Sequence, residues 1–213
     1  LSVETYISFR HKIGEWNEVK SNVNSALKIY NLSATYDFNE NIKLTLGRKI
    51  NPLISNLGAN DGLQLEGRLN NIKVGAVIGT RPDYTDYSIN KNLMQFGTYI
   101  AHEYSPKNKY MRNSLAFIQQ MNNSITDRRF IYIQHQNKLV DNLYLFSSFE
   151  VDLYKMDNDT SKNTFDLTGF YFMTRYKFNK NLSITATYDA RKQVIYYETY
   201  KNFLDQLLDQ ETR

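Results

Sequence analysis

Apolar and polar residues alternate along most of this chain with a period of two, the period of side chains on opposite faces of a β-strand. In residues 182–191, for example, Leu182 and Ile184 share one face, whereas Ser183 and Thr185 share the other. About eleven such runs are predicted, near residues 1–9, 30–38, 42–46, 63–68, 72–78, 93–104, 110–121, 130–137, 143–154, 165–178 and 182–191. The pattern therefore indicates an all-β chain, and several runs have the roughly 9 to 12 residues that a tilted strand needs to cross a bilayer.

The connections between these runs are predicted to alternate between short and long. Short turns are expected at residues 39–41, 70–71, 105–109, 138–142 and 179–181, and long loops at 11–25, 47–61, 80–92, 122–129 and 155–164. This alternation is typical of an up-and-down antiparallel sheet whose two edges differ. Outer-membrane β-barrels have tight turns at one edge and longer loops at the other, whereas a soluble up-and-down barrel has no need of such regularity.

A turn motif recurs at the short edge. Residues 36–42 (YDFNENI) match residues 176–182 (YKFNKNL), and residues 104–110 are a looser copy. Asn suits such turns because it tolerates left-handed backbone conformations. The aromatic residues before each turn are predicted to form an aromatic girdle at one membrane interface: Tyr36, Phe38, Tyr104, Tyr176 and Phe178. Ordinary hairpins in a soluble sheet would also explain this motif.

Composition is compatible with this interpretation. Hydrophobic residues make up 41% of the chain and mean hydropathy is −0.56, as expected for strands with one polar face. The sequence contains no apolar run of the roughly 18 to 20 residues that a membrane helix needs. Cysteine is absent, so the sequence offers no disulfide. The net charge of +4 comes from scattered residues, which does not indicate a nucleic-acid partner.

A second motif carries a family resemblance. Residues 44–51 (LTLGRKIN) followed by 58–63 (GANDGL) form a strand, a Gly-Arg pair, a loop and an Asp-Gly pair that opens another strand. With the turn motif, this unit resembles the porin-like outer-membrane proteins of Gram-negative bacteria, particularly those of the Bacteroidetes type. The resemblance implies a bacterial outer-membrane location and a transmembrane barrel with a path for solutes or export.

The strand count sets the expected domain organisation. Bacterial single-chain barrels use even strand numbers, so about eleven strands in residues 1–191 predict part of a larger barrel. Residues 192–213 are predicted to be an outer-loop segment or a helical C-terminal tail, because Phe203, Leu204, Leu207 and Leu208 lie on one helical face.

If the apolar stripe of each strand faces lipid, the polar stripe faces the barrel lumen. The lumen or pore candidates are Arg48, Asp61, Glu66, Arg68, Lys73, Glu150, Asp152 and Arg175. Both signs of charge are present, which predicts a wet or salt-bridged lumen without strong ion selectivity. The charges could line an open pore or fill a closed barrel. Arg48 and Asp61 could belong to a constriction loop that contacts an anionic solute, although a structural pair that holds loop 47–61 is favoured.

Catalysis is not expected. His102 lies next to Glu103, but adjacent strand residues point to opposite faces and do not form a catalytic dyad. The prediction includes neither a metal nor a cofactor. The expected function is passage or binding of small polar solutes, with membrane lipid as partner. The alternative is a closed accessory barrel whose long outer loops bind another envelope protein. Oligomeric state is left open.

Overall fold

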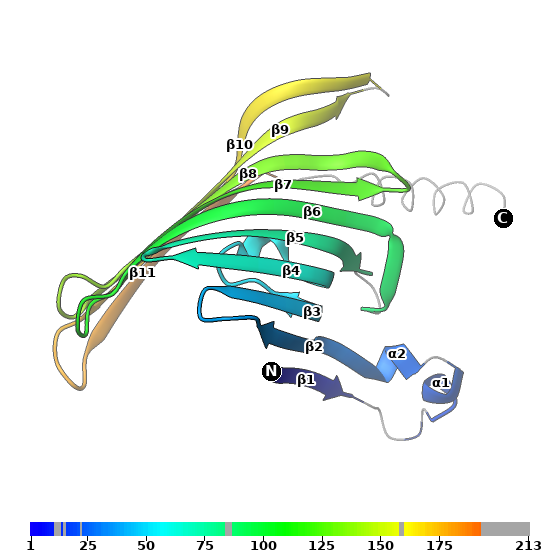
Figure 1. Ribbon diagram of the computed structural model, residues 1–213, viewed down its shortest axis with the longest axis horizontal. Helices are drawn as coiled ribbons and strands as arrows, with labels where there is room; N and C mark the ends of the chain where they lie inside the picture. Colours follow the sequence, from blue (N-terminus) through cyan, green and yellow to red (C-terminus); the bar gives the residue numbers. More distant parts are fainter. Residues whose placement is uncertain (11–13, 15, 22, 84–86, 158–159, 193–213) are drawn as a thin grey trace.

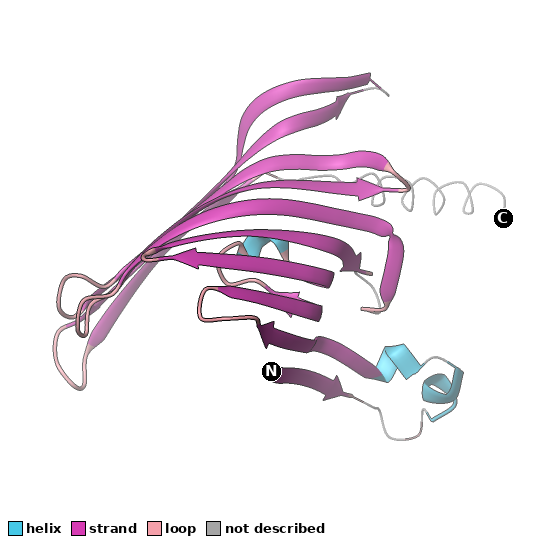
Figure 2. Cartoon of the chain, in the orientation of Figure 1, coloured by secondary structure: helices cyan, strands magenta, loops and turns pink. Residues whose placement is uncertain are grey.

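The structure, a computed structural model, describes residues 1–10, 14, 16–21, 23–83, 87–157 and 160–192. Its described part contains one antiparallel sheet of eleven strands, each hydrogen-bonded to its neighbours in sequence (Figures 1 and 2). The strands are β1 (Ser2–Phe9), β2 (Leu27–Asp37), β3 (Ile42–Ile50), β4 (Ala59–Leu69), β5 (Ile72–Pro82), β6 (Ile89–Tyr104), β7 (Met111–Asn122), β8 (Ile125–Asn137), β9 (Leu143–Asp157), β10 (Thr160–Lys177) and β11 (Ser183–Arg191). The sheet is open, with β1 and β11 as its edge strands.

The short helical segments lie in the connections. They are α1 (Trp16–Ser21) and α2 (Val23–Ala26) between β1 and β2, and the 3-10 helix η1 (Ser55–Leu57) between β3 and β4. None of the described helices has the length and apolar character to cross a membrane. Residues 193–213, for which a loop or helical tail was predicted, lie outside the described residues.

The prediction of eleven antiparallel up-and-down strands is confirmed. Strands β7 and β8 form even though both of their faces mix polar and apolar residues. Strands β9 and β10, of 15 and 18 residues, run further than the alternating pattern indicated. Their extra length consists mostly of polar residues, and its backbone still pairs across the ladder as far as Asp157 and Thr160.

The predicted long loops at 122–129 and 155–164 are corrected, because most of their residues belong to strands. Strands β7 and β8 are joined by Asn123 and Ser124 alone, both with positive φ, as a two-residue hairpin of the primed type requires. Strands β9 and β10 pair as far as Asp157 and Thr160. The polar side chains near the first turn bind one another instead of solvent: Arg129 Nε donates to Gln119 Oε1 at 2.9 Å. Composition alone made these segments resemble loops.

The repeated turn motif has the same geometry at both of its sites. In the first, the backbone N–H groups of Asn41 and Ile42 donate to the side-chain oxygen of Asn39 at 2.8 and 2.9 Å. In the second, those of Asn181 and Leu182 donate to Asn179 at 2.9 Å each. The motif thus works through a side-chain acceptor. The left-handed conformations that were expected occur in other turns, at Asn70 and Asn142.

The connection of residues 51–58 folds back across the sheet. Leu53, Ile54 and Leu57 are buried in one cluster with residues of β5 to β8, including Tyr99 and Tyr132. Ser114 Oγ donates to the carbonyl of Leu53 at 2.7 Å. We call residues 51–58 the inward loop and the sheet face that it covers the loop-bearing face. Strand alternation assigns the following residues to that face: Thr35, Thr45, Gln64, Glu66, Tyr99, Ser114, Tyr132, Gln134, Glu150 and Asp152.

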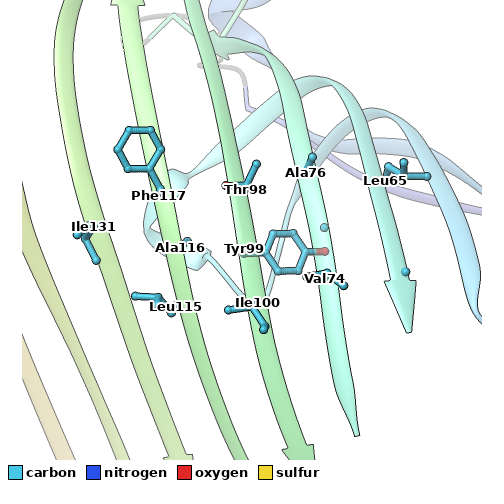
Figure 3. A pocket seen from close by; sticks show the side chains of 12 residues that line it. Leu65, Val74, Ala76, Thr98, Tyr99, Ile100, Leu115, Ala116, Phe117 and Ile131 are labelled. Carbon is cyan, nitrogen blue, oxygen red and sulfur yellow. The ribbon is translucent and has the colours of Figure 1, made fainter. Parts of the chain in front are cut away.

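The opposite face, which we call the open face, is largely apolar, and most of it is not covered by other described residues. Ten large side chains on it each expose 38 to 58% of their surface: Leu46, Leu63, Leu65, Val74, Ile78, Phe96, Ile100, Leu115, Phe117 and Ile133. The strand register aligns Leu46, Leu63, Ile78 and Phe96 as direct cross-strand neighbours. A shallow groove of about 640 Å³ runs along this face, and Figure 3 shows the apolar side chains that line it.

Two glycines allow the strands to approach closely on the loop-bearing face. Gly47 and Gly62 are direct partners in the β3–β4 ladder. Gly47 has φ +109°, and a Cβ at Gly62 would lie 2.1 Å from the carbonyl oxygen of Ile78. A larger residue at either position would therefore force the backbone apart.

Candidate functional site

A charged cluster lies on the loop-bearing face near the edge with the short turns. Lys43 Nζ lies 3.0 Å from Glu66, and Lys73 Nζ lies 2.8 Å from Glu103 and 3.8 Å from Glu66. Arg112 Nε binds Glu103 at 2.8 Å. These contacts link β3 to β7 in one chain of alternating charge, which we call the turn-side cluster. Its carboxylates are largely buried, with side-chain exposures of 12% for Glu66 and 15% for Glu103.

Tyr99 connects this cluster to the packing under the inward loop. Its hydroxyl donates to Glu66 at 2.8 Å, and its ring lies against the backbone of Gly75 on the neighbouring strand. A Cβ at Gly75 would lie 2.4 Å from that ring. The Tyr99 ring is thus held in place by β5 while its polar end completes the hydrogen bonding of a buried carboxylate.

A small cavity of about 140 Å³ lies between the turn-side cluster and the start of the inward loop. Lys43, Lys49, Lys73 and Arg112 line it together with Glu66. Thr35 and Thr45 also line it, and their hydroxyls are hydrogen-bonded to each other at 2.9 Å. The cavity is therefore rich in hydrogen-bond donors.

A second polar cluster lies near the opposite edge of the same face. Arg128 binds Asp152 with Nε at 3.1 Å and Nη2 at 2.6 Å, and its Nη2 binds Glu150 at 2.9 Å. Thr168 donates to Asp152 at 2.8 Å. The Arg128 guanidinium also stacks 4.1 Å from the centre of the Phe130 ring. We call this group the loop-side cluster. One arginine faces two carboxylates there, so the cluster carries a net negative charge.

The inward loop separates the two clusters along the loop-bearing face. Its apolar side chains pack against Ala116, Ile118 and Phe130, all buried. Its polar contacts range from the 2.7 Å hydrogen bond between Ser114 and the Leu53 carbonyl to the longer contacts of Ser55 Oγ, which lies 3.3 Å from both Tyr132 and Gln134. The middle of this face is therefore filled by protein, and charged groups lie on either side of the filled region.

Arg48 and Asp61 form a separate unit. The guanidinium binds both carboxylate oxygens of Asp61 at 2.5 Å and also the carbonyls of Ile29 and Tyr87 at 2.7 Å. The ladder register places the pair on the open face, because Arg48 follows Leu46 by two residues and Asp61 precedes Leu63 by two. The pair therefore does not share a face with Glu66, Lys73, Glu150 and Asp152, the other charged residues for which a lumen position was predicted. Their charge suggested the lumen, but strand alternation assigns them to the other face, where Tyr87 covers them.

The other predicted lumen residues divide into two groups. Glu66, Lys73, Glu150 and Asp152 belong to the two clusters. Arg68 and Arg175 lie on the same face, but they are exposed and bind only nearby acceptors, the Asn70 carbonyl and the Ser183 hydroxyl.

Three important partners, Glu103, Arg112 and Arg128, were not proposed as lumen candidates from the sequence. Arg128 lay in a segment that was predicted to be a loop. Arg112 lay in a strand whose two faces are mixed. Glu103 and Arg112 are direct cross-strand partners, so a correct strand register would have identified that pair.

The predicted aromatic girdle residues lie at one edge of the open face. Tyr36, Tyr104 and Tyr176 end their strands or come close to the end, and strand alternation assigns all three to this face. Tyr36 and Phe38 pack edge to face at 5.0 Å, and Tyr176 and Phe178 do so at 4.7 Å. All five predicted girdle residues are exposed.

Among the described residues, no group of three or more His, Asp or Glu side chains is placed to hold a metal ion. The Glu103 carboxylate forms ion pairs with Lys73 and Arg112.

A search of protein-family models gave no match to this chain, and a search of curated proteins gave no significant match. The site therefore has to be interpreted from its own geometry.

Proposed function

We propose that this chain forms the membrane-spanning wall of a bacterial outer-membrane β-barrel that passes or binds small polar solutes. The observation that carries the proposal is the inverted distribution of residues between the two faces. Exposed apolar side chains make up most of the open face, apart from the Arg48–Asp61 pair, whereas the loop-bearing face carries buried ion pairs and amides beside the apolar packing of the inward loop. A barrel in lipid has this distribution, with hydrocarbon outside and a polar interior.

The energetics of the open face support a lipid environment. Rows of leucine, isoleucine, valine and phenylalanine continue across β3 to β8, and each side chain keeps a large part of its surface exposed. Soluble proteins rarely expose continuous apolar patches larger than a few hundred Å². Hydrocarbon tails would remove this surface from water with a gain of about 25 cal/mol per Å².

Strand length and the aromatic edge agree with this placement. Strands β6 to β10 contain 12 to 18 residues, more than the roughly 9 to 11 that a tilted transmembrane strand requires. Tyrosine and phenylalanine at the short-turn edge are suited to the boundary between hydrocarbon and water. Porin-like outer-membrane proteins of the Bacteroidetes type, which the sequence resembles, are the family that we propose for this chain.

Closure of the barrel requires more than these eleven strands. Within the described residues, strands β1 and β11 each have a neighbouring strand on one side alone, and unpaired backbone groups at a sheet edge have no water to bind inside a bilayer. We therefore infer that further strands complete a barrel with an even strand number. The loop-bearing face would line its interior.

A closed accessory barrel is the second candidate, and one observation favours it. The inward loop packs Leu53, Ile54 and Leu57 tightly against β5 to β8, which narrows the interior instead of leaving it open. In that case the loops at the opposite edge from the short turns would bind another protein of the envelope.

Reconstitution tests the proposal and separates the two candidates. The protein is refolded into phosphatidylcholine vesicles and planar bilayers, and membrane insertion and single-channel conductance are measured. Insertion with solute-sized conductance steps supports the pore. Insertion without conductance supports the accessory barrel. A protein that stays monodisperse in water without detergent, and does not insert, would contradict both and would support a soluble β-rich binding module.

A further inference from the structure

The cavity beside the turn-side cluster has the features of a binding site. Its volume is about 140 Å³, which corresponds to roughly four or five water molecules at about 30 Å³ each. The walls come from strands β2 to β7, and the start of the inward loop closes one side. A small solute would therefore contact the sheet and the loop at the same time.

The charges that line this cavity are mostly positive. Lys43, Lys49, Lys73 and Arg112 line it, with Glu66 as the one carboxylate among its lining residues. Behind them, Glu103 is shared by Lys73 and Arg112, and Glu4 binds Lys49. Four cations thus face three carboxylates, which leaves one positive charge in excess.

Exposure increases this imbalance. The Glu4 side chain is 52% exposed whereas that of Lys49 is 22% exposed, so solvent screens the attraction between the two groups. The charges at the next ladder positions cancel each other. Asp37, opposite Lys43, is negative, and Arg68, opposite Lys73, is positive. The excess positive charge is therefore local to the cavity.

Neutral donors complete the site. The hydroxyls of Thr35 and Thr45 are hydrogen-bonded to each other. That bond uses one of their two O–H hydrogens, so the other can be donated to a bound acceptor. Cations with a hydroxyl donor on one wall match the needs of a carboxylate or phosphate oxygen.

We propose that this cavity binds a small oxyanion, a carboxylate or an inorganic phosphate, between Lys43, Lys49, Lys73 and Arg112. The inference rests on the proposed function in one respect, because it takes the loop-bearing face to be the wet interior of the barrel. It then identifies anionic solutes as the class that this part of the interior retains.

Isothermal titration of the protein refolded in a nonionic maltoside detergent tests the proposal. Sodium phosphate and sodium acetate are titrated separately, with sodium chloride at the same ionic strength as the reference. Saturable binding of either oxyanion is expected, and the anion that binds more tightly identifies the preferred class. Absence of saturable binding to the folded wild-type protein would overturn the proposal.

Lys49→Gln and Lys43→Gln are expected to weaken binding by about tenfold each, the effect of losing one charge-assisted hydrogen bond. Lys49→Arg keeps the charge and should retain the affinity, as should Lys180→Gln, which removes an exposed lysine in the β10–β11 turn. Equal losses in Lys49→Gln and Lys180→Gln would contradict the site. Lys49→Gln is the safest variant for folding, since the carboxylate that it leaves unpaired is exposed.

The outcome is independent of the bilayer experiments. Insertion and conductance without anion binding would overturn this inference alone. Anion binding by a protein that does not insert into membranes would overturn the proposed function and leave the cavity site in place.

Discussion

Neighbouring residues on the same strand show how differently the two faces of this sheet are used. Ser114 on the loop-bearing face is 3% exposed, whereas the next residue, Leu115 on the open face, is 48% exposed. On β8, Gln134 is 1% exposed and Ile133 is 41% exposed. In both pairs the polar residue is buried and the apolar residue is not. At these positions burial follows the face of the sheet and not the hydrophobicity of the side chain, unlike in the core of a protein that folds in water.

The loop-side cluster gives the largest expected effect. Arg128→Met leaves the carboxylates of Glu150 and Asp152 buried without their cation, and should lower the free energy of unfolding by about 3 to 5 kcal/mol. Arg129→Met is the matched control, because Arg129 lies next along β8 and binds the neutral Gln119. Urea unfolding of the refolded protein measures both. Equal effects in the two variants would mean that the loop-bearing face does not depend on its buried ion pairs.

Introducing a charged residue on the open face should destabilise the protein to a degree that depends on its depth in the membrane. Leu115→Arg should lower the free energy of unfolding in vesicles by about 2 to 4 kcal/mol, because an arginine near the bilayer midplane loses its hydration. Leu182→Arg, at the short-turn edge, should cost only about 0 to 1 kcal/mol. If both substitutions are harmless in vesicles, the open face does not meet hydrocarbon.

Packing under the inward loop can be tested with two isoleucines. Ile54, a residue of the inward loop, is fully buried against the sheet, whereas Ile50 at the end of β3 is 48% exposed. Ile54→Ala should cost about 2 to 3 kcal/mol, the lower part of the range for large-to-small changes, because a surface loop can relax around the cavity. Ile50→Ala should cost much less. A similar cost for both, in urea unfolding, would show that the loop is not anchored as described.

The smallest expected effect concerns the two repeated turns at the short-turn edge of the sheet. Asn39→Ala removes the side-chain acceptor for two backbone N–H groups and should cost about 1 kcal/mol. Asn179→Ala should have the same effect, because the second turn is built in the same way. Asn41→Ala serves as the control. Thermal unfolding of the three variants compares them, and a larger loss in Asn41→Ala would refute the proposed role of Asn39.

Much of the fold could be predicted from residue patterns because β-strands are local. The alternation of Leu182, Ser183, Ile184 and Thr185 identifies a strand without knowledge of its neighbours, and a repeated YxFNxN sequence identifies two equivalent turns. The prediction failed where polar residues continue a strand, at 122–129 and 155–164. Side chains such as Thr126 and Arg129 look like loop residues in one dimension, and only pairing shows that both bind Gln119 on the neighbouring strand.

The candidate site could be predicted only in part. Glu66, Lys73, Glu150 and Asp152 were identified because each is a charge at a polar position of a strand. The cross-strand pair of Glu103 and Arg112 and the cation Arg128, which binds Glu150 and Asp152, were missed, since these contacts join different strands and depend on register. Arg48 and Asp61 were correctly noticed as a pair, but they lie on the face opposite to the one expected.

The sequence by itself determined that this chain forms antiparallel strands with one apolar and one polar stripe, because side-chain alternation is fixed by the geometry of a single strand. Only the tertiary structure decided how the inward loop folds, which charges meet and which face stays uncovered. These features depend on contacts between residues far apart in the chain, such as Ser55 with Gln134. Local backbone preferences do not encode such contacts, since the free energy of each depends on which strands lie side by side.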